Sequence, residues 1–222
     1  MARSIKHRLY SASPFHTPHL AIRDHWALTD VSFQIRQGEN VAVLGKNGSG
    51  KTTLFRILSR ITMPTTGRGI IHGKASCLLQ AGTGFHPELS GRENVFMNGM
   101  IIGMSRQEIR RKFDEIVAFS GVEEFIDVPL KFYSTGMQSR LGFSVAAHLD
   151  TQIMLLDEGM ASGDSEFRAK SIQKIKEMSR EGRTLLFVSH EPQLIREICS
   201  RALVMERGKL IEDTTDLTSL LP

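Results

Sequence analysis

The chain has 222 residues, enough for one well-buried domain and too few for two ordinary ones. Its hydrophobic content of 41% and charged content of 23% lie in the globular range, which excludes a disordered chain or a membrane-embedded body. The net charge of +4 is compatible with a nucleic-acid surface or with nearness to anionic lipid headgroups, and it is too small to decide between them.

The cysteine and hydropathy patterns indicate a protein of a reducing compartment. Cys77 and Cys199 stand in apolar settings without a C-x-x-C partner, so we expect neither a disulfide framework nor a zinc site. No apolar run approaches the ~18 residues of a membrane span, and the N-terminal residues mix basic side chains without an apolar core. We therefore expect a chain that is neither secreted nor self-inserting. The basic cluster at 106–112 is most simply a solvated helix face, so we expect no nucleic-acid partner.

The first predicted elements lead into a glycine-rich loop. Val31, Phe33 and Ile35 alternate with polar residues, which predicts a half-buried strand followed by a turn at 37–39. A second strand starts at Asn40, and its continuous apolar run is typical of a strand covered on both faces. Beyond the loop, one face of a helix is marked by Leu54, Ile57, Leu58 and Ile61.

The middle of the chain is predicted to be helical, and the last third returns to strands. Residues 88–149 have the texture of an inserted helical lobe, in which Ser105 and Glu108 form a capping box. The strands expected after the lobe are 153–156, 184–188 and the two arms of a hairpin around Arg207 and Gly208. A helix that carries Ile172, Ile175 and Met178 separates the first two of them. This order of elements predicts an α/β fold.

The glycine-rich loop is a complete phosphate-binding motif, G-x-x-x-x-G-K-[ST], between a buried strand and a helix. Its glycines let backbone N–H groups turn toward phosphate oxygens, and the helix presents its positive N-terminal end. Lys51 is expected to neutralise the β- and γ-phosphates, and Thr52 to ligate Mg²⁺. The nucleotide-binding residues expected here are Gly45, Asn47, Gly48, Ser49, Gly50, Lys51, Thr52 and Thr53.

A second pair of groups for this chemistry follows the strand at 153–156. Asp157 is expected to hold Mg²⁺ and Glu158 to polarise the attacking water. In isolation the two acids could equally cap the next helix. Beside a phosphate loop, the catalytic interpretation is favoured.

These motifs and their order make the chain resemble the ABC ATPase family across nearly its whole length. Gln80 stands at the place of the family's Q-loop, which implies a role in catalysis and as a metal ligand. Ser134 and Gly136 occupy the place of the signature motif, Asp164 that of the D-loop, and His190 that of the switch histidine. The signature departs from the family pattern, because Thr135 replaces a glycine and Met137 a glutamine. The aromatic residue that stacks on adenine is expected to be Tyr10, with Phe15 and Trp26 as alternatives.

The resemblance also implies an architecture and an assembly. It implies one ABC nucleotide-binding domain over 1–222. Residues 1–87 and 150–222 would form a P-loop NTPase core together with an N-terminal antiparallel β subdomain, and residues 88–149 would form a helical subdomain with the signature motif. ATP and Mg²⁺ are the implied cofactors. Two copies would hold ATP head to tail across a two-fold axis, so that Ser134 and Gly136 act in trans. Hydrolysis would loosen the two halves and drive a partner's conformational cycle.

Longer motifs narrow the resemblance to polysaccharide exporters of bacteria. The run at 133–143 is similar to their Y-S-S-G-M-x-S-R-L-x-F, the run at 89–95 to L-x-G-R-E-N-V, and that at 157–164 to D-E-x-x-x-x-G-D. The implied function is ATP-driven export of a capsular or O-antigen polysaccharide. The implied partner is a separate permease, contacted near residues 80–94, at the cytoplasmic face of the inner membrane. An ABC ATPase of teichoic-acid or small-molecule export is the alternative, and one acting on nucleic acid or ribosomes is disfavoured by the chain length.

Overall fold

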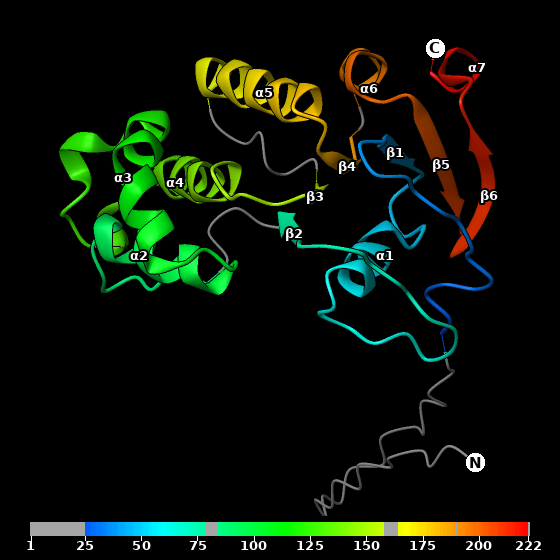
Figure 1. Cartoon of the computed structure of the whole chain (residues 1–222), viewed down its shortest axis with the longest axis horizontal. Helices are drawn as coiled ribbons and strands as arrows, with labels where there is room; N and C mark the ends of the chain where they lie inside the picture. The colour runs from blue at the N-terminus through cyan, green and yellow to red at the C-terminus, as the bar shows by residue number, and fades with distance from the viewer. Residues whose placement is uncertain (1–24, 79–83, 158–163, 190, 222) are drawn as a thin grey trace, which may run out of the picture.

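The computed structural model of the chain describes residues 25–78, 84–157, 164–189 and 191–221 (Figure 1). Within these ranges no helix is long and apolar enough to cross a membrane. The described residues form one mixed sheet with helices on its faces and a cluster of helices beside it.

The sheet has the strand order β2-β3-β4-β1-β5-β6. Its strands are β1 (Asn40–Leu44), β2 (Ala75–Leu78), β3 (Ile153–Leu156), β4 (Thr184–Phe187), β5 (Arg201–Glu206) and β6 (Lys209–Thr214). The first five run parallel, and β6 closes the edge antiparallel to β5 through the predicted hairpin. Because parallel strands end at the same edge of a sheet, the loops that follow β1, β2, β3 and β4 emerge side by side.

Alternating side chains of the strands supply two separate cores. On one face, Ala42, Leu156 and Phe187 pack against helices α5 (Ser165–Arg180) and α6 (Pro192–Ile198). On the other face, Val43 and Leu155 pack against helix α1 (Lys51–Leu58), with the partly buried Val31, Phe33 and Ile35 beside them. The short helix α7 (Leu217–Leu220) packs on the first of these cores. Burial on both faces explains why these strands are continuous apolar runs.

Three helices form a lobe beside the sheet (Figure 1). They have a hydrophobic core of their own. They are α2 (Gly91–Ile101), α3 (Arg106–Ser120) and α4 (Thr135–Ala147), and the 3₁₀ turns η1 (Glu123–Phe125) and η2 (Leu130–Phe132) precede α4. A complete capping box starts α2, where Ser90 and Glu93 cap each other. The expected box at α3 is only half formed: Ser105 accepts from the backbone of Glu108, whose carboxylate accepts the backbone N–H of Asp150 instead.

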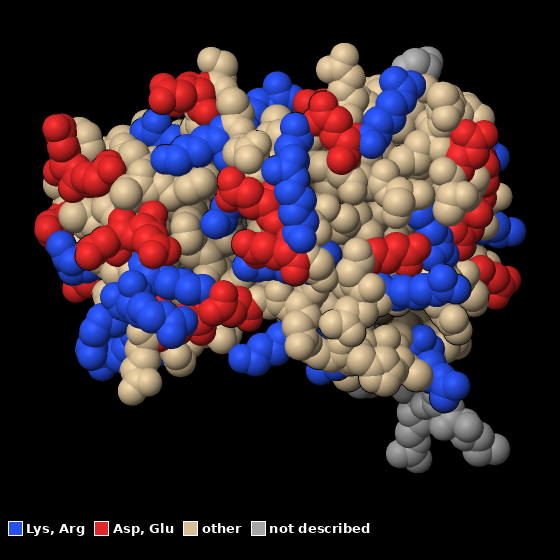
Figure 2. All heavy atoms as spheres, turned by 45° about the horizontal axis from the view of Figure 1, so that its top comes forward, with Lys and Arg blue, Asp and Glu red and all other residues tan. Residues whose placement is uncertain are grey.

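The basic cluster at 106–112 is partly neutralised by acidic neighbours. Lys112 lies 2.6 Å from Asp150 and 3.8 Å from Glu108, and Arg111 lies 3.7 Å from Asp150. Basic and acidic side chains are interspersed over the face drawn in Figure 2. The cluster thus behaves as the solvated, ion-paired helix surface that the sequence indicates.

The structure confirms the α/β core with an inserted helical lobe and, besides the half-formed box at α3, corrects three details. Residues 31–36 form no strand, although their side chains alternate in exposure as predicted, because their backbone finds no ladder partner among the described residues. Helix α1 ends at Leu58, and the left-handed Arg60, at φ 59°, turns Ile61 outward to 66% exposure, so Ile61 is not on the buried face. Strand β2 is an element that the sequence pattern did not predict.

Candidate functional site

The phosphate loop between β1 and α1 has a backbone that requires its glycines. Gly45 and Gly50 have φ of 145° and 103°. A side chain on Gly45 would place its Cβ 2.2 Å from the carbonyl oxygen of Met205, and one on Gly50 would lie 2.8 Å from that of Ala27. These contacts fit the loop tightly against β5 and the segment before β1. The glycines therefore allow both the turn and the close packing that hold it in place.

The loop directs its polar groups toward the start of α1. Gly50 caps the helix without a side-chain hydrogen bond, and no acidic residue stands in the first turn. The hydroxyl of Ser49 is buried and has no hydrogen-bond partner among the described residues. Open N–H groups at a helix start attract anions, and a buried unpaired hydroxyl adds a donor. This chemistry fits a phosphate group.

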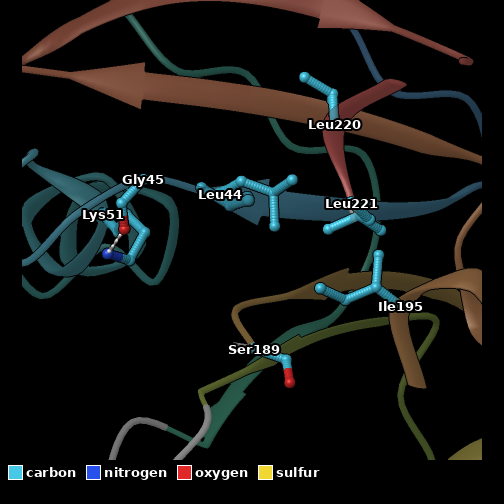
Figure 3. Close-up of a pocket in the computed structure, with 8 residues that line it drawn as sticks. Leu44, Gly45, Lys51, Ser189, Ile195, Leu220 and Leu221 are labelled. Atoms are coloured by element: carbon cyan, nitrogen blue, oxygen red, sulfur yellow. Dashed lines mark hydrogen bonds between the residues drawn. The ribbon is translucent and has the colours of Figure 1, made fainter. Parts of the chain in front are cut away.

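The ammonium group of Lys51 turns back over this loop. Its Nζ donates to the carbonyl oxygen of Gly45 at 2.5 Å (Figure 3). It also donates to the carbonyl oxygen of Lys46 at 3.2 Å. Thr52 follows on the first turn of α1 and is exposed. Asn47 and Gly48 are exposed at the loop's tip. A positive charge and an accessible hydroxyl thus flank the open helix start.

The sheet brings the other predicted groups to the same edge. Strand β4 lies between β1 and β3, so the ends of β1 and β3 are two strand spacings apart, on the order of 10 Å. Asp157 leaves β3 at this edge and is partly exposed. Ser189 follows β4, and with Lys51 and Gly45 it lines a cavity of about 190 Å³ (Figure 3). The other walls of this cavity come from the end of β1, from α6, and from Leu220 and Leu221. A phosphate loop and a carboxylate therefore stand on neighbouring parts of one edge.

Four predicted residues lie outside the described residues: Tyr10, Gln80, Glu158 and His190. Their described neighbours still locate three of them along the chain. Leu78 ends β2 two residues before Gln80, Asp157 directly precedes Glu158, and Ser189 directly precedes His190. Each of these neighbours is at, or just beyond, the end of a parallel strand at the phosphate-loop edge. The roles of the four residues remain predictions.

Ser134 and Gly136 form an exposed turn on the helical lobe. Ser134 is the N-cap of α4, and its hydroxyl accepts the backbone N–H of Met137 at 3.2 Å. Gly136 is open, because a Cβ there would meet only the Ser134 hydroxyl, at 3.8 Å. The preceding Tyr133 anchors the turn: its buried hydroxyl donates to the carbonyl oxygen of Phe125 at 2.6 Å, and burial raises the pKa of Tyr133 to about 12. The turn is thus a fixed helix start that faces solvent.

Asp164 caps helix α5 and pairs with a residue of the lobe. Its carboxylate accepts the backbone N–H of Phe167 at 2.9 Å and lies 3.1 Å from Nη1 of Arg140 on α4. The backbone hydrogen bond, aided by the Arg140 charge, lowers the pKa of the Asp164 carboxyl below its ordinary value. Asp164 is therefore charged and held in place at neutral pH.

Two residues of this region are not singled out by any motif along the chain. Arg140 lies within the signature run at 133–143, but its partner Asp164 is 24 residues away and comes close only because α4 packs near α5. Ser189 follows a predicted strand, and that position at the end of a parallel strand was the available signal. Its hydroxyl accepts the backbone N–H of Glu191 at 3.1 Å.

Comparisons with known proteins agree with this geometry. The sequence pattern of the family described as ABC transporter matches residues 28–161. The chain is 41% identical to the O-antigen export system ATP-binding protein RfbB of Klebsiella pneumoniae over 86% of this chain and 77% of that protein. It is 44% identical to the teichoic acids export ATP-binding protein TagH of Lactococcus lactis over 85% of this chain and 40% of that longer protein.

A solved structure shares the fold. The dimeric post-hydrolysis state of the ATP-binding cassette MJ0796, bound to ADP and Pi, superposes with a TM-score of 0.73, covering 86% of this chain and 90% of that one. At 24% identity, this likeness establishes the fold alone.

Proposed function

The chain belongs to the ABC transporter family as an ATP-binding subunit, and we propose that it binds and hydrolyses ATP to drive export of a polysaccharide of the capsular or O-antigen type across the bacterial inner membrane. The observation that carries this proposal is the phosphate loop, with Lys51 and the buried Ser49 hydroxyl at the open start of α1, on a chain whose relative in Klebsiella pneumoniae is named for O-antigen export.

The residues present fit MgATP. Backbone N–H groups from Gly45 to Thr53 would bind the β- and γ-phosphates, and Lys51 would exchange its loop carbonyls for phosphate oxygens. Thr52 and Asp157 would hold Mg²⁺, with Gln80 as a further ligand. The metal would neutralise charge on the phosphates. Tyr10 would stack on the adenine.

Hydrolysis needs a base and groups that sense the γ-phosphate. Glu158, next to Asp157, would orient and deprotonate the attacking water. His190, next to Ser189, would contact the γ-phosphate from the neighbouring strand end. Because the loops after β1, β3 and β4 emerge at one edge, a single phosphate could meet all three.

The site would be completed by a second copy of the chain. The exposed Ser134 turn offers a hydroxyl and the open N–H groups of α4, which suit a γ-phosphate, and the absence of a side chain at Gly136 permits close approach. A head-to-tail homodimer would place this turn over the partner's phosphate loop, with Asp164 at the same interface. ATP would then join the two copies, and hydrolysis would release them.

Transport would require a separate integral-membrane permease. We propose that it contacts the lobe near residues 80–94, and that the chain meets the membrane's cytoplasmic face only through this partner, without a nucleic-acid ligand. We keep the division into a core over 1–87 and 150–222 and a helical subdomain over 88–149 as part of this proposal. Teichoic-acid export is the second candidate, favoured by the relatives named for it.

Complementation tests the cargo. A bacterial strain from which the gene for this protein has been deleted would receive the gene for the wild-type chain or for the Lys51→Met variant. The control is Lys46→Met, because Lys46 is an exposed lysine of the same loop. We expect surface polysaccharide with the wild type and the control and none with Lys51→Met. Loss of a phosphate-rich polyol polymer would identify teichoic-acid export instead, and unchanged surface polymers in all strains would refute export of either.

A further inference from the structure

An ion pair joins helix α4, which begins at the signature motif, to Asp164 at the start of helix α5. Arg140 lies on α4, less than two helical turns after Ser134, and its Nη1 is 3.1 Å from Oδ2 of Asp164, the N-cap of α5. The Arg140 side chain is 25% exposed, and its Nε is buried with no hydrogen-bond partner among the described residues. The guanidinium is thus enclosed on one side and aimed at Asp164 on the other.

An aromatic cluster fixes the distance between the two helices at this point. Phe143 of α4 and Phe167 of α5 meet edge to face with ring centroids 5.8 Å apart, and Phe119 of α3 contacts both rings. Lys170 of α5 donates to the carbonyl oxygens of Ala118 and Phe119 at the end of α3. These contacts make the junction between the lobe and the sheet a packed joint. Figure 1 shows the two helices that meet there, α4 and α5.

The two elements that meet at this joint carry groups for two different nucleotides of the proposed dimer. Helix α4 begins at the Ser134 turn, which would serve the nucleotide of the partner subunit. Asp164 stands seven residues after Asp157, which would serve the chain's own nucleotide. Aromatic packing sets the distance between α4 and α5 but permits one helix to shift along the other. A directional ion pair favours one position of α4 along α5.

We propose that Arg140 is a positioning residue for ATP hydrolysis, which holds Asp164 so that the Ser134 turn and Asp157 keep one relative placement. Through this link, the group that serves one nucleotide moves together with the carboxylate that serves the other, which couples the two sites of the dimer. The inference rests on the proposed function and assigns to Arg140 a role that requires no contact with nucleotide.

The chain supplies a matched control for the test. Lys176 and Glu197 form an ion pair of 2.5 Å between α5 and α6, with side-chain exposures of 27% and 55%, against 25% and 55% for Arg140 and Asp164. Both helices of the control pair pack on the same face of the sheet, so its loss leaves the joint with the lobe untouched. Pairs this exposed contribute little to folding, so neither loss should unfold the chain.

The experiment compares four variants of the full-length protein: Arg140→Ala, Arg140→Lys, Asp164→Asn and Lys176→Ala. Three properties are measured for each: the ATPase rate as a function of MgATP concentration, the affinity for a fluorescent ATP analogue, and thermal unfolding. Asparagine at 164 preserves the helix cap while it removes the charge. We expect Arg140→Ala to lower kcat about tenfold and to abolish cooperativity between the sites, with analogue affinity within about twofold of wild type. Arg140→Lys should restore most of kcat, since the pair uses one nitrogen, and Lys176→Ala should match the wild type.

The combined Arg140→Ala and Asp164→Asn variant tests the pair itself. If the two residues act together, the double variant should be no slower than the slower single variant. Multiplied losses, or an Arg140→Ala protein with the kinetics of Lys176→Ala, would overturn the proposal. Should Arg140→Ala prove unstable, Arg140→Lys and Asp164→Asn still decide it. A wild-type protein that binds no MgATP would refute the proposed function instead, which separates the two failures.

Discussion

The ammonium nitrogen of Lys51 lies 2.5 Å from the carbonyl oxygen of Gly45, at the opposite end of the same phosphate loop. Backbone oxygens of the loop thus hold the Lys51 ammonium group, and no side chain caps the start of helix α1 beside it. Phosphate oxygens carry more charge than carbonyl oxygens and would displace them in a charge-assisted bond. The loop is therefore arranged in advance for an anion.

Replacing Lys51 by Met should remove most of the affinity for MgATP. A lost charge-assisted hydrogen bond costs about 1.5–3 kcal/mol, which corresponds to about 10- to 100-fold weaker binding. Isothermal titration calorimetry measures this, with Lys46→Met as the control because Lys46 offers only its carbonyl oxygen to this contact. Equal affinity in the Lys51→Met protein and the wild type would contradict the assignment of the loop.

Mixed dimers should show that Ser134 acts on the partner's nucleotide. A dimer of a Ser134→Ala subunit with a Lys51→Met subunit retains one intact composite site if Ser134 acts in trans, and we expect it to hydrolyse ATP at up to about half of the wild-type rate. A dimer that carries both changes on one subunit retains none. The reverse order of these two rates would establish action in cis.

Loss of a helix cap is a separate effect of the Ser134→Ala change, and it needs its own control. Ser105 caps α3 with the same geometry, since both hydroxyls accept a backbone N–H at 3.2 Å. Each Ser→Ala change should cost about 1 kcal/mol of stability. We expect Ser105→Ala homodimers to hydrolyse ATP at the wild-type rate.

The sequence was sufficient where local chemistry determines structure. The strand, loop and helix of the phosphate loop are defined by its glycines, by Lys51 and by the apolar run before them. Ser134 and Asp164 are N-caps of helices, and each is a polar residue directly before a sequence with helical periodicity. Ile61 was misplaced because the end of α1 depends on the left-handed Arg60, an uncommon conformation for arginine. The pair of Arg140 with Asp164 depends on tertiary packing, which spacing along the chain does not reveal.

Adding a methyl group at Gly91 should destabilise the lobe. A Cβ there would lie 2.3 Å from the hydroxyl oxygen of Tyr133 and 2.9 Å from the carbonyl oxygen of Ile126. We expect Gly91→Ala to lower the free energy of unfolding by about 1–3 kcal/mol, measured by urea denaturation. Gly69→Ala is the control, because nothing lies within 4 Å of a Cβ at that position. A partial recovery is expected when Tyr133→Phe is added, and an unchanged midpoint for Gly91→Ala would contradict the packing.

Acid should weaken the attachment of β6 and of the segment before β1. Arg201 lies 2.6 Å from Asp213 and 2.9 Å from Glu39. Its hydrogen bond lowers the pKa of Asp213, and although burial alone would raise the pKa of Glu39, hydrogen bonds from the Arg36 backbone and from Arg201 leave it lowered. The ordinary pKa values are 3.8 for Asp and 4.5 for Glu. A carboxyl group whose pKa is lowered by folding stabilises the folded chain at a pH above its ordinary pKa, and this stabilisation is lost as the pH falls below that value toward the lowered pKa.

The matching variant is Arg201→Met, which removes the cation that both carboxylates share. Between about pH 5 and pH 3 the unfolding free energy of the wild type should fall more steeply than that of Arg201→Met. Urea denaturation at a series of pH values measures both slopes. Parallel curves would show that Arg201 does not lower these pKa values.

The most direct test of a nucleotide held between two copies is sedimentation velocity of the Glu158→Gln protein, with protein and nucleotide absorbance recorded together. Removing the proposed base should leave phosphate binding intact and stop hydrolysis. We predict that ATP and Mg²⁺ convert this variant to a dimer that carries the nucleotide with it, and that Lys51→Met abolishes the conversion. Nucleotide that sediments with a monomer, or no bound nucleotide at all, would contradict the composite site.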